Sequence, residues 1–201
     1  MLGLRESLLD GTEAIYSSSG SDSIKVDSYS YREFMSDVKD QGNTMQCAAY
    51  SVAQVVEWHH RTMGVRRPKF DILDLYGRRS EAEGMSFKEV VSLLKNRYTL
   101  NGESHRIVEG VMITSEFLFR SFLLSAPLVL GLPVRDNRAT TERFWRGDGN
   151  YGLHAVTCTG FNSEGLEVLN SWGSVYGDGG YGLLPWSDLN QVTEAWGFLF
   201  E

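Results

Sequence analysis

The chain has 201 residues, of which 42% are hydrophobic and 12% aromatic, enough apolar surface for the core of one domain or of two small lobes. Its 19 basic and 26 acidic side chains give a net charge of −7, which argues against nucleic acid as a partner. The longest apolar run, residues 122–134, is interrupted by Ser125, Pro127 and Pro133 and is shorter than the roughly 18 residues of a membrane-spanning helix. We therefore expect neither a nucleic-acid partner nor a membrane partner.

Residues 1–23 carry few signals of regular structure. The stretch 16–23 is rich in serine and also holds a glycine, a composition typical of a flexible linker. Arg5 and Asp10 fall where a secretory signal needs an uninterrupted apolar stretch. We therefore predict a flexible segment over 1–23, a globular domain over 24–201 and a cytoplasmic location, with export by a route that needs no such signal left open.

Helices are predicted through the first part of the domain, about 40–125. Residues 45–58 are apolar nearly all round, which indicates a helix buried at the centre of a core. Ser86 and Glu89 have the spacing of a capping box, which predicts that a helix begins at Ser86. A further helix is expected over 115–124.

The pattern changes after Pro127, where short apolar runs alternate with glycine-rich turns. Such runs are typical of β-strands. The predicted strands are 128–134, 153–161, 166–169, 181–184 and 197–200. The sequence thus predicts an α+β chain, with a helical lobe over about 40–125 followed by an antiparallel, barrel-like β lobe over about 126–201.

The chain has two cysteines, Cys47 and Cys158. Cys47 ends a polar, glycine-bearing loop and begins the buried helix, where backbone N–H groups and the helix dipole favour the thiolate. Taken alone, Cys47 is also compatible with a small buried residue at the start of an apolar helix, and we interpret Cys158 in that way. The four histidines, at 59, 60, 105 and 154, lack the spacing of a metal site, so we expect no metal and no cofactor.

Three short motifs occur in order along the chain. Gln41 precedes Cys47 by six residues, His154 lies in the sequence Leu-His-Ala-Val, and Asn170 begins Asn-Ser-Trp-Gly, 16 residues after His154. The first motif lies in the predicted helical part, and the other two lie in the predicted β part. With the motifs in this order, residues 26–184 resemble the papain-like cysteine proteases. The resemblance implies a papain-like fold of two lobes with the active site in the cleft between them.

The resemblance also implies a role for each motif residue. Cys47 would be the nucleophile, and His154 its base and later the acid for the leaving amine. Asn170 would orient the far ring nitrogen of His154, and Gln41 would donate to the oxyanion. The substrate-binding residues implied are Gly84, Met85, Gly131, Leu153, Ala155 and Trp172. Gly84 would keep part of the backbone rail that binds an extended substrate, and Trp172 also shields the histidine. The pocket formed by Met85, Gly131, Leu153 and Ala155 favours an apolar side chain two positions before the cleaved bond.

The sequence departs from the family at several positions. Thr44 stands where the family has a cysteine, Ala48 replaces the tryptophan that follows the nucleophile, and only Gly84 remains of a glycine pair. The missing cysteines fit a reducing compartment. The roughly 25 residues before the domain are too few for the family's helical prosegment, so we expect no inhibitory proregion.

These observations favour a cysteine endopeptidase that cleaves protein or peptide substrates through an acyl-thioester on Cys47. One alternative keeps the active site but transfers the acyl group to an amine or releases ammonia, as transglutaminase-like and deamidating enzymes do. A second alternative is a non-catalytic module that binds within a larger assembly.

Overall fold

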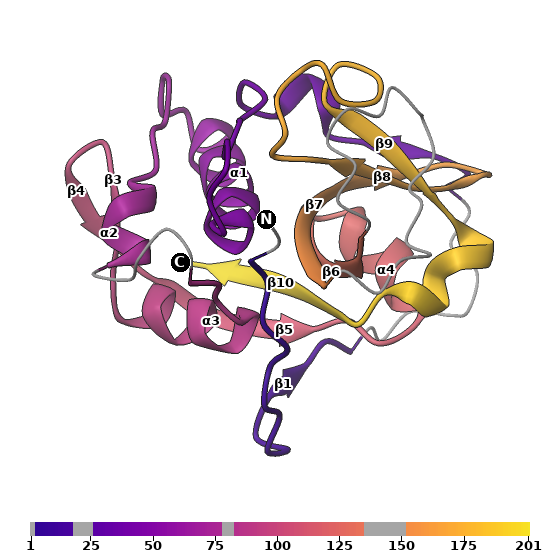
Figure 1. Cartoon of the computed structure of the whole chain (residues 1–201), viewed down its shortest axis with the longest axis horizontal. Coiled ribbons are helices and arrows are strands. Elements are labelled where there is room, and N and C mark those ends of the chain that lie inside the picture. Colours follow the sequence, from indigo (N-terminus) through magenta and orange to yellow (C-terminus); the bar gives the residue numbers. More distant parts are fainter. Residues whose placement is uncertain (1–2, 18–25, 78–82, 135–151) are drawn as a thin grey trace.

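The computed structural model describes residues 3–17, 26–77, 83–134 and 152–201. Its helices are α1 (Cys47–Thr62), α2 (Ile72–Tyr76), α3 (Phe87–Asn96) and α4 (Glu116–Leu123), with short 3-10 helices at Arg32–Phe34 and Trp186–Gln191. Its strands are β1 (Ala14–Ile15), β2 (Tyr29–Ser30), β3 (Tyr98–Leu100), β4 (Glu103–His105), β5 (Ile107–Met112), β6 (Leu128–Pro133), β7 (Leu153–Phe161), β8 (Gly165–Leu169), β9 (Tyr181–Pro185) and β10 (Glu194–Phe200). Helices α1, α2 and α3 gather on one side of the molecule, and β7, β8 and β9 lie on the other (Figure 1).

Helices α1, α3 and α4 form where the sequence predicts them, whereas α2 lies in a stretch for which no separate helix is predicted. Helix α1 is buried along most of its length because small and apolar side chains cover nearly every face, which confirms the expected central helix and extends it to Thr62. Helix α3 begins with the capping box, since the Ser86 side chain accepts from the Glu89 N–H and the Glu89 carboxylate accepts from the Ser86 N–H. Helix α4 begins after Ser115, whose side chain accepts from the Leu118 N–H.

The main sheet has the order β1-β5-β10-β6-β7-β8-β9, and β2 pairs with β7 as well. All of these pairs are antiparallel except β1 with β5. Within the described residues the sheet is open, because β1 and β9 end the order without pairing to each other. The β lobe is thus part of a larger open sheet, not a closed barrel, because β10 pairs on its other edge with β5 from the mainly helical part.

Two apolar clusters fill the space around the sheet. One surrounds α1 and α3 and includes Cys47, Met85 and Ala155; the other lies between α4 and the strands β6, β7 and β8. The register of β6 with β7 sets Leu132 opposite His154. The N-terminus of α1 and the start of β7 therefore meet at the first cluster. No helix among the described ranges is long and apolar enough to cross a membrane.

Candidate active site

The site begins with Cys47, the first residue of α1, whose side chain is fully buried. The loop before it is joined to the turn that follows β8, since the Gln41 N–H donates to the Ser171 carbonyl (2.9 Å) and the Gly173 N–H donates to the Lys39 carbonyl (3.0 Å). From β7, the backbone N–H of Ala155 hydrogen-bonds to the Cys47 sulfur. The fold thus sets the residue beside His154 directly against the thiol.

His154 is held by Asn170 from the turn after β8. Its Nε2 lies 2.8 Å from Asn170 Oδ1, and the same oxygen accepts the Ser171 N–H at 2.8 Å. Because Oδ1 accepts in both contacts, Nε2 carries the imidazole hydrogen, which leaves Nδ1 as the basic nitrogen of a neutral ring. Trp172 stacks on the imidazole with ring centroids 4.7 Å apart, so an almost fully buried indole covers the histidine.

The Gln41 side chain is also fixed, with only 2% of its surface exposed. Its Nε2 donates to the Thr44 carbonyl (2.7 Å), and its Oε1 accepts from the Ser171 hydroxyl (2.6 Å). Ser171 thereby contacts both Gln41 and, through its N–H, Asn170. Its part in the site was not predicted, although the Asn-Ser-Trp-Gly motif contains it.

A stretch of the N-terminal segment occupies the predicted substrate cleft. Leu4 lies between Met85, which precedes α3, and Leu153, the first residue of β7; it pairs in parallel with Met85 and antiparallel with Leu153. The Arg5 N–H donates to the Met85 carbonyl (3.0 Å), the Met85 N–H to the Gly3 carbonyl (2.9 Å) and the Leu4 N–H to the Leu153 carbonyl (3.3 Å). Nothing in the linker-like composition of this segment indicates that placement, and residues 18–23 of the expected linker lie outside the described ranges.

The Leu4 side chain fills the pocket expected for an apolar substrate residue. It is 6% exposed and belongs to one cluster with Cys47, Met85 and Ala155. A Cβ on Gly131 would stand 2.8 Å from Leu4 Cδ2, and a Cβ on Gly84 would stand 1.9 Å from the Gly3 carbonyl oxygen. Glycine is therefore required at both positions for the segment to lie this close.

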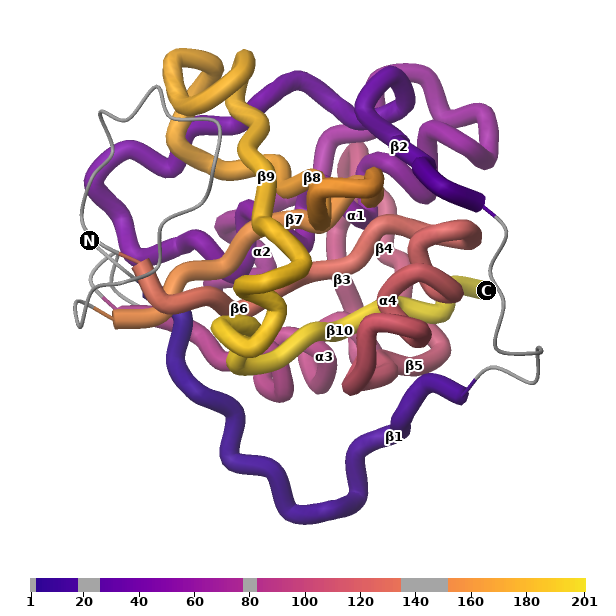
Figure 2. The backbone as a smooth tube through the Cα atoms, turned by 90° about the vertical axis from the view of Figure 1, so that its right-hand side faces the viewer, coloured from indigo at the N-terminus to yellow at the C-terminus, as the bar shows by residue number. Residues whose placement is uncertain are grey.

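The segment continues along the outside of α3 and ends in β1 beside β5 (Figure 2). Lys88 on α3 forms ion pairs with Asp10 (3.0 Å) and Glu13 (2.6 Å), and Arg5 pairs with Glu89. The Thr12 hydroxyl and the Lys88 ammonium hold the pKa of the Asp10 carboxyl well below its usual range. These contacts anchor the part of the segment that follows Leu4.

The covered site changes the chemistry of the thiol. Burial raises the pKa of Cys47, although the N–H groups of Ala155, Gly3 and Ala48 act in the opposite direction. The expectation that the start of α1 favours a thiolate is therefore wrong for the arrangement seen here, because desolvation outweighs the helix terminus. The N–H of Gly3 is one of the groups that lower this pKa, so the N-terminal segment lies beside the sulfur.

Six of the ten residues predicted for the site contact residues 3–4 or share the apolar cluster of Leu4: Cys47, Gly84, Met85, Gly131, Leu153 and Ala155. The other four are joined by hydrogen bonds or ring stacking around the imidazole and through Ser171: His154, Asn170, Gln41 and Trp172. Cys158 lies apart on β7, buried, with its sulfur 3.6 Å from the Gly160 carbonyl. Among the described ranges, no group of three or more His, Cys, Asp or Glu side chains is arranged to hold a metal ion.

No model of a protein family matches the chain, and no curated protein resembles it in sequence. Solved structures do match. The cysteine protease xylellain from Xylella fastidiosa superposes with a TM-score of 0.85 at 15% identity, over 100% of this chain and 96% of that one. Procathepsin B S9 from Trypanosoma congolense gives 0.83 at 14% identity, over 100% and 87%.

The Carica candamarcensis cysteine protease CMS1MS2, solved with the inhibitor E-64, gives a TM-score of 0.73 at 16% identity, over 88% of this chain and 99% of that one. Identities this low establish a shared fold and nothing finer. The open mixed sheet, the buried central helix and the cleft between them thus form the papain-like fold, the fold of papain-like cysteine proteases.

Proposed function

We propose that the protein is a cysteine peptidase that cleaves peptide bonds in protein or peptide substrates. One observation carries the proposal: the nucleophile candidate Cys47, the oriented pair of His154 and Asn170, and the fixed amide of Gln41 meet in one buried site. A nucleophile, a base and a third group that orients the base are the parts that covalent acyl transfer requires.

The first half of the reaction forms the acyl-enzyme. The Cys47 thiol gives its proton to His154 Nδ1, and the sulfur attacks the carbonyl carbon of the peptide bond. The oxyanion accepts hydrogen bonds from the second hydrogen of Gln41 Nε2 and from the backbone N–H of Cys47. When the carbon–nitrogen bond breaks, His154 returns the proton to the leaving amine, and a thioester remains on Cys47.

The second half releases the acid. His154 takes a proton from a water molecule, the hydroxide attacks the thioester carbonyl, and the proton returns to the departing sulfur. Asn170 keeps the imidazole facing the sulfur throughout, because it holds Nε2 from the opposite side of the ring. Trp172 covers that hydrogen bond and limits competition from water.

The contacts of Leu4 support a preference for an apolar substrate side chain. A leucine already fits the pocket next to Met85, Gly131 and Ala155, and it is almost fully buried there. An extended substrate would form backbone hydrogen bonds with Met85 and Leu153, the two residues that now pair with Leu4.

The closed cleft favours one alternative. Because Cys47 is fully buried under Gly3 and its thiol pKa is raised, the same structure suits a non-catalytic module whose cleft stays filled. An acyltransferase or deamidase would use the same residues with a different acceptor. It is therefore distinguished only by its products, an amide of an added amine or free ammonia.

The test is covalent labelling with a peptidyl epoxide that reacts with cysteine protease thiolates, followed by intact mass. We expect one adduct on the wild-type chain and faster labelling of a chain that lacks residues 1–9. We expect none on the Cys47→Ala variant and slow labelling of the His154→Ala variant. Cys158→Ala is the matched control and should label like the wild type, because that cysteine lies outside the cleft. A folded chain without residues 1–9 that takes no label would refute the peptidase and support the module.

A further inference from the structure

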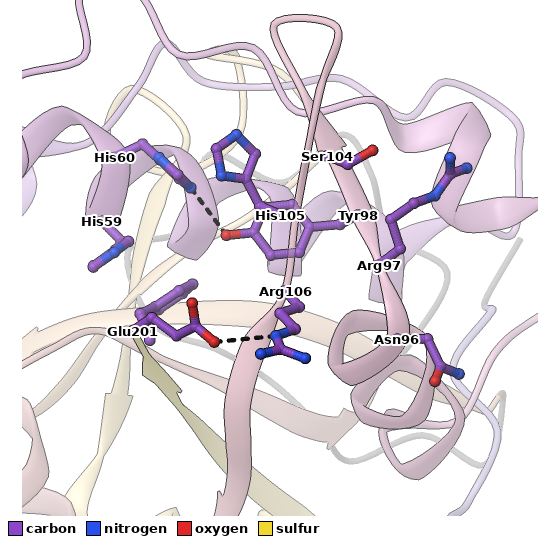
Figure 3. Close-up of a pocket in the computed structure, with 10 residues that line it drawn as sticks. His59, His60, Asn96, Arg97, Tyr98, Ser104, His105, Arg106 and Glu201 are labelled. Atoms are coloured by element: carbon purple, nitrogen blue, oxygen red, sulfur yellow. Dashed lines mark hydrogen bonds and ion pairs between the residues drawn. The ribbon is translucent and has the colours of Figure 1, made fainter.

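A second cavity lies at the other end of α1 from Cys47. It has a volume of about 480 Å³ and is lined by His59, His60, Asn96, Arg97, Tyr98, Ser104, His105, Arg106, Phe200 and Glu201. These residues come from the ends of α1 and α3, from β3 and β4, and from the chain end after β10. In Figure 3, His60, His105 and Tyr98 lie together, and Arg106 lies beside Glu201. With a rise of about 1.5 Å per residue, His59 is roughly 18 Å along the helix from Cys47, so this cavity is separate from the cleft.

Three of the four histidines of the chain meet in this cavity. The rings of His60 and His105 have centroids 4.7 Å apart, and those of His59 and His60 are 5.3 Å apart. His60 Nε2 lies 2.9 Å from the Tyr98 hydroxyl. His105 Nε2 is buried and has no hydrogen-bond partner among the described residues, so the protein leaves one buried polar atom in the cavity wall for a ligand to satisfy.

Each arginine at the cavity forms an ion pair with a carboxylate, and a ligand could take the place of that carboxylate. Arg106 pairs with Glu201 (3.0 Å) and Arg97 with Asp74 (2.9 Å), and both arginine side chains are more than half exposed. Exposed ion pairs of this kind contribute little to stability. An incoming anion can therefore displace Glu201 from the Arg106 guanidinium at small cost.

The imidazoles of His59 and His60 are held in the neutral form. Burial, together with His60, lowers the pKa of His59 to about 4, and burial, together with His105, lowers the pKa of His60. Burial and the carboxylate of Glu201 raise the pKa of Tyr98 to about 12, so its hydroxyl stays a donor. An anion beside these rings would stabilise their protonated forms.

We propose that this cavity binds a small organic oxyanion, a phosphate or carboxylate carried on an apolar ring. Arg106 would hold the charged group and His105 Nε2 would bind one of its oxygens, while Tyr98 and Phe200 supply apolar surface for the ring. The volume lies within the range of about 300–1,000 Å³ that ligand pockets have and exceeds what a bare inorganic ion fills. We do not favour a metal ion as the ligand, because no group of His, Cys, Asp or Glu side chains among the described residues is arranged to hold one.

The proposal predicts a dependence on pH. Protonation of His59 or His60 adds positive charge beside the anion that Glu201 only partly offsets. Since the bound anion raises the pKa values of these imidazoles, binding is stronger below those pKa values and weaker above them. A shift of one pKa unit corresponds to about a tenfold change in affinity.

The experiment follows the imidazole C2–H signals by proton NMR, because the chain has only four histidines. Phenyl phosphate and benzoate are the organic probes, inorganic phosphate tests the bare ion, and benzyl alcohol is the neutral ring. We expect the signals of His59, His60 and His105 to move while that of His154 stays. We also expect phenyl phosphate to bind about tenfold tighter than inorganic phosphate, and several-fold tighter at pH 4 than at pH 7.5, because the pKa of the free His59 imidazole is about 4.

Two variants complete the design. Arg106→Gln should weaken binding of phenyl phosphate about tenfold or more, the loss of one charge-assisted contact. Arg32→Gln is the matched control, because Arg32 also pairs with an exposed carboxylate, that of Asp178, but lies outside the cavity; it should bind like the wild type. Equal loss in both variants, equal binding of benzyl alcohol, or shifts caused only by zinc would overturn the proposal. No peptide substrate is used, so the result is independent of the peptidase assignment.

Discussion

Replacing Leu4 by alanine should open the cleft. The Leu4 side chain is 6% exposed, and burying a leucine contributes about 2 kcal/mol. Truncation to alanine therefore weakens the closed arrangement by about 2 kcal/mol, which corresponds to a roughly 30-fold larger open fraction. Because a peptidyl epoxide reaches Cys47 only when the cleft is open, we expect the rate of labelling to rise by about the same factor.

Leu8 provides the matched control within the same segment, because its side chain is 89% exposed. Leu8→Ala should label at the wild-type rate, and both variants should keep the wild-type melting temperature within a few degrees. The measurement is the second-order rate of epoxide labelling by intact mass at pH 6.5. Equal rates for Leu4→Ala, Leu8→Ala and the wild type would show that Leu4 does not hold the cleft closed, and would refute this reasoning.

Three further changes test the site. Gln41→Ala should lower kcat in peptide hydrolysis about 10²–10³-fold, because it removes one oxyanion donor. It should also lower the melting temperature, because the Thr44 carbonyl and the Ser171 hydroxyl lose a buried partner; an unchanged kcat in the folded variant would contradict the oxyanion role. Removing residues 1–9 should lower the midpoint pH of Cys47 labelling, because the burial that raises its thiol pKa is reduced; a pH–rate profile checks this, and an unmoved midpoint would count against it. Lys88→Ala should increase labelling by less than about fivefold, because its ion pairs with Asp10 and Glu13 are largely at the surface and such pairs contribute about 0–1 kcal/mol; stopped-time labelling at low and high salt measures it, and a rate that falls would argue against an anchoring role.

The local parts of the fold were predictable from the sequence. The capping box at Ser86 and the all-apolar character of α1 are signals carried by neighbouring residues, and the structure has both. The site motifs are likewise short, so their order was enough to group Cys47, His154 and Asn170.

The position of the N-terminal segment was not predictable in the same way. Leu4 finds its partners at Met85 and Leu153, far along the chain, and no periodicity in residues 3–9 records those contacts. The extent of the sheet was missed for a related reason. Buried and exposed residues do not alternate regularly along β5. The need for glycine at position 110 of β5 comes from helix α3, because a Cβ on Gly110 would stand 2.5 Å from a methyl group of Val91.

The central position of β10 determines how this cleft can open. One edge of β10 pairs with β5 and the other with β6, so a single sheet runs continuously beneath both walls of the cleft. Swinging the walls apart would break backbone hydrogen bonds in the middle of that sheet, whereas lifting residues 3–5 breaks only a few bonds at one short segment. Local opening takes the least costly route. Under the proposed function, a substrate would therefore enter as residues 3–5 peel away from a rigid frame, and the protein would exchange its own chain for the incoming one.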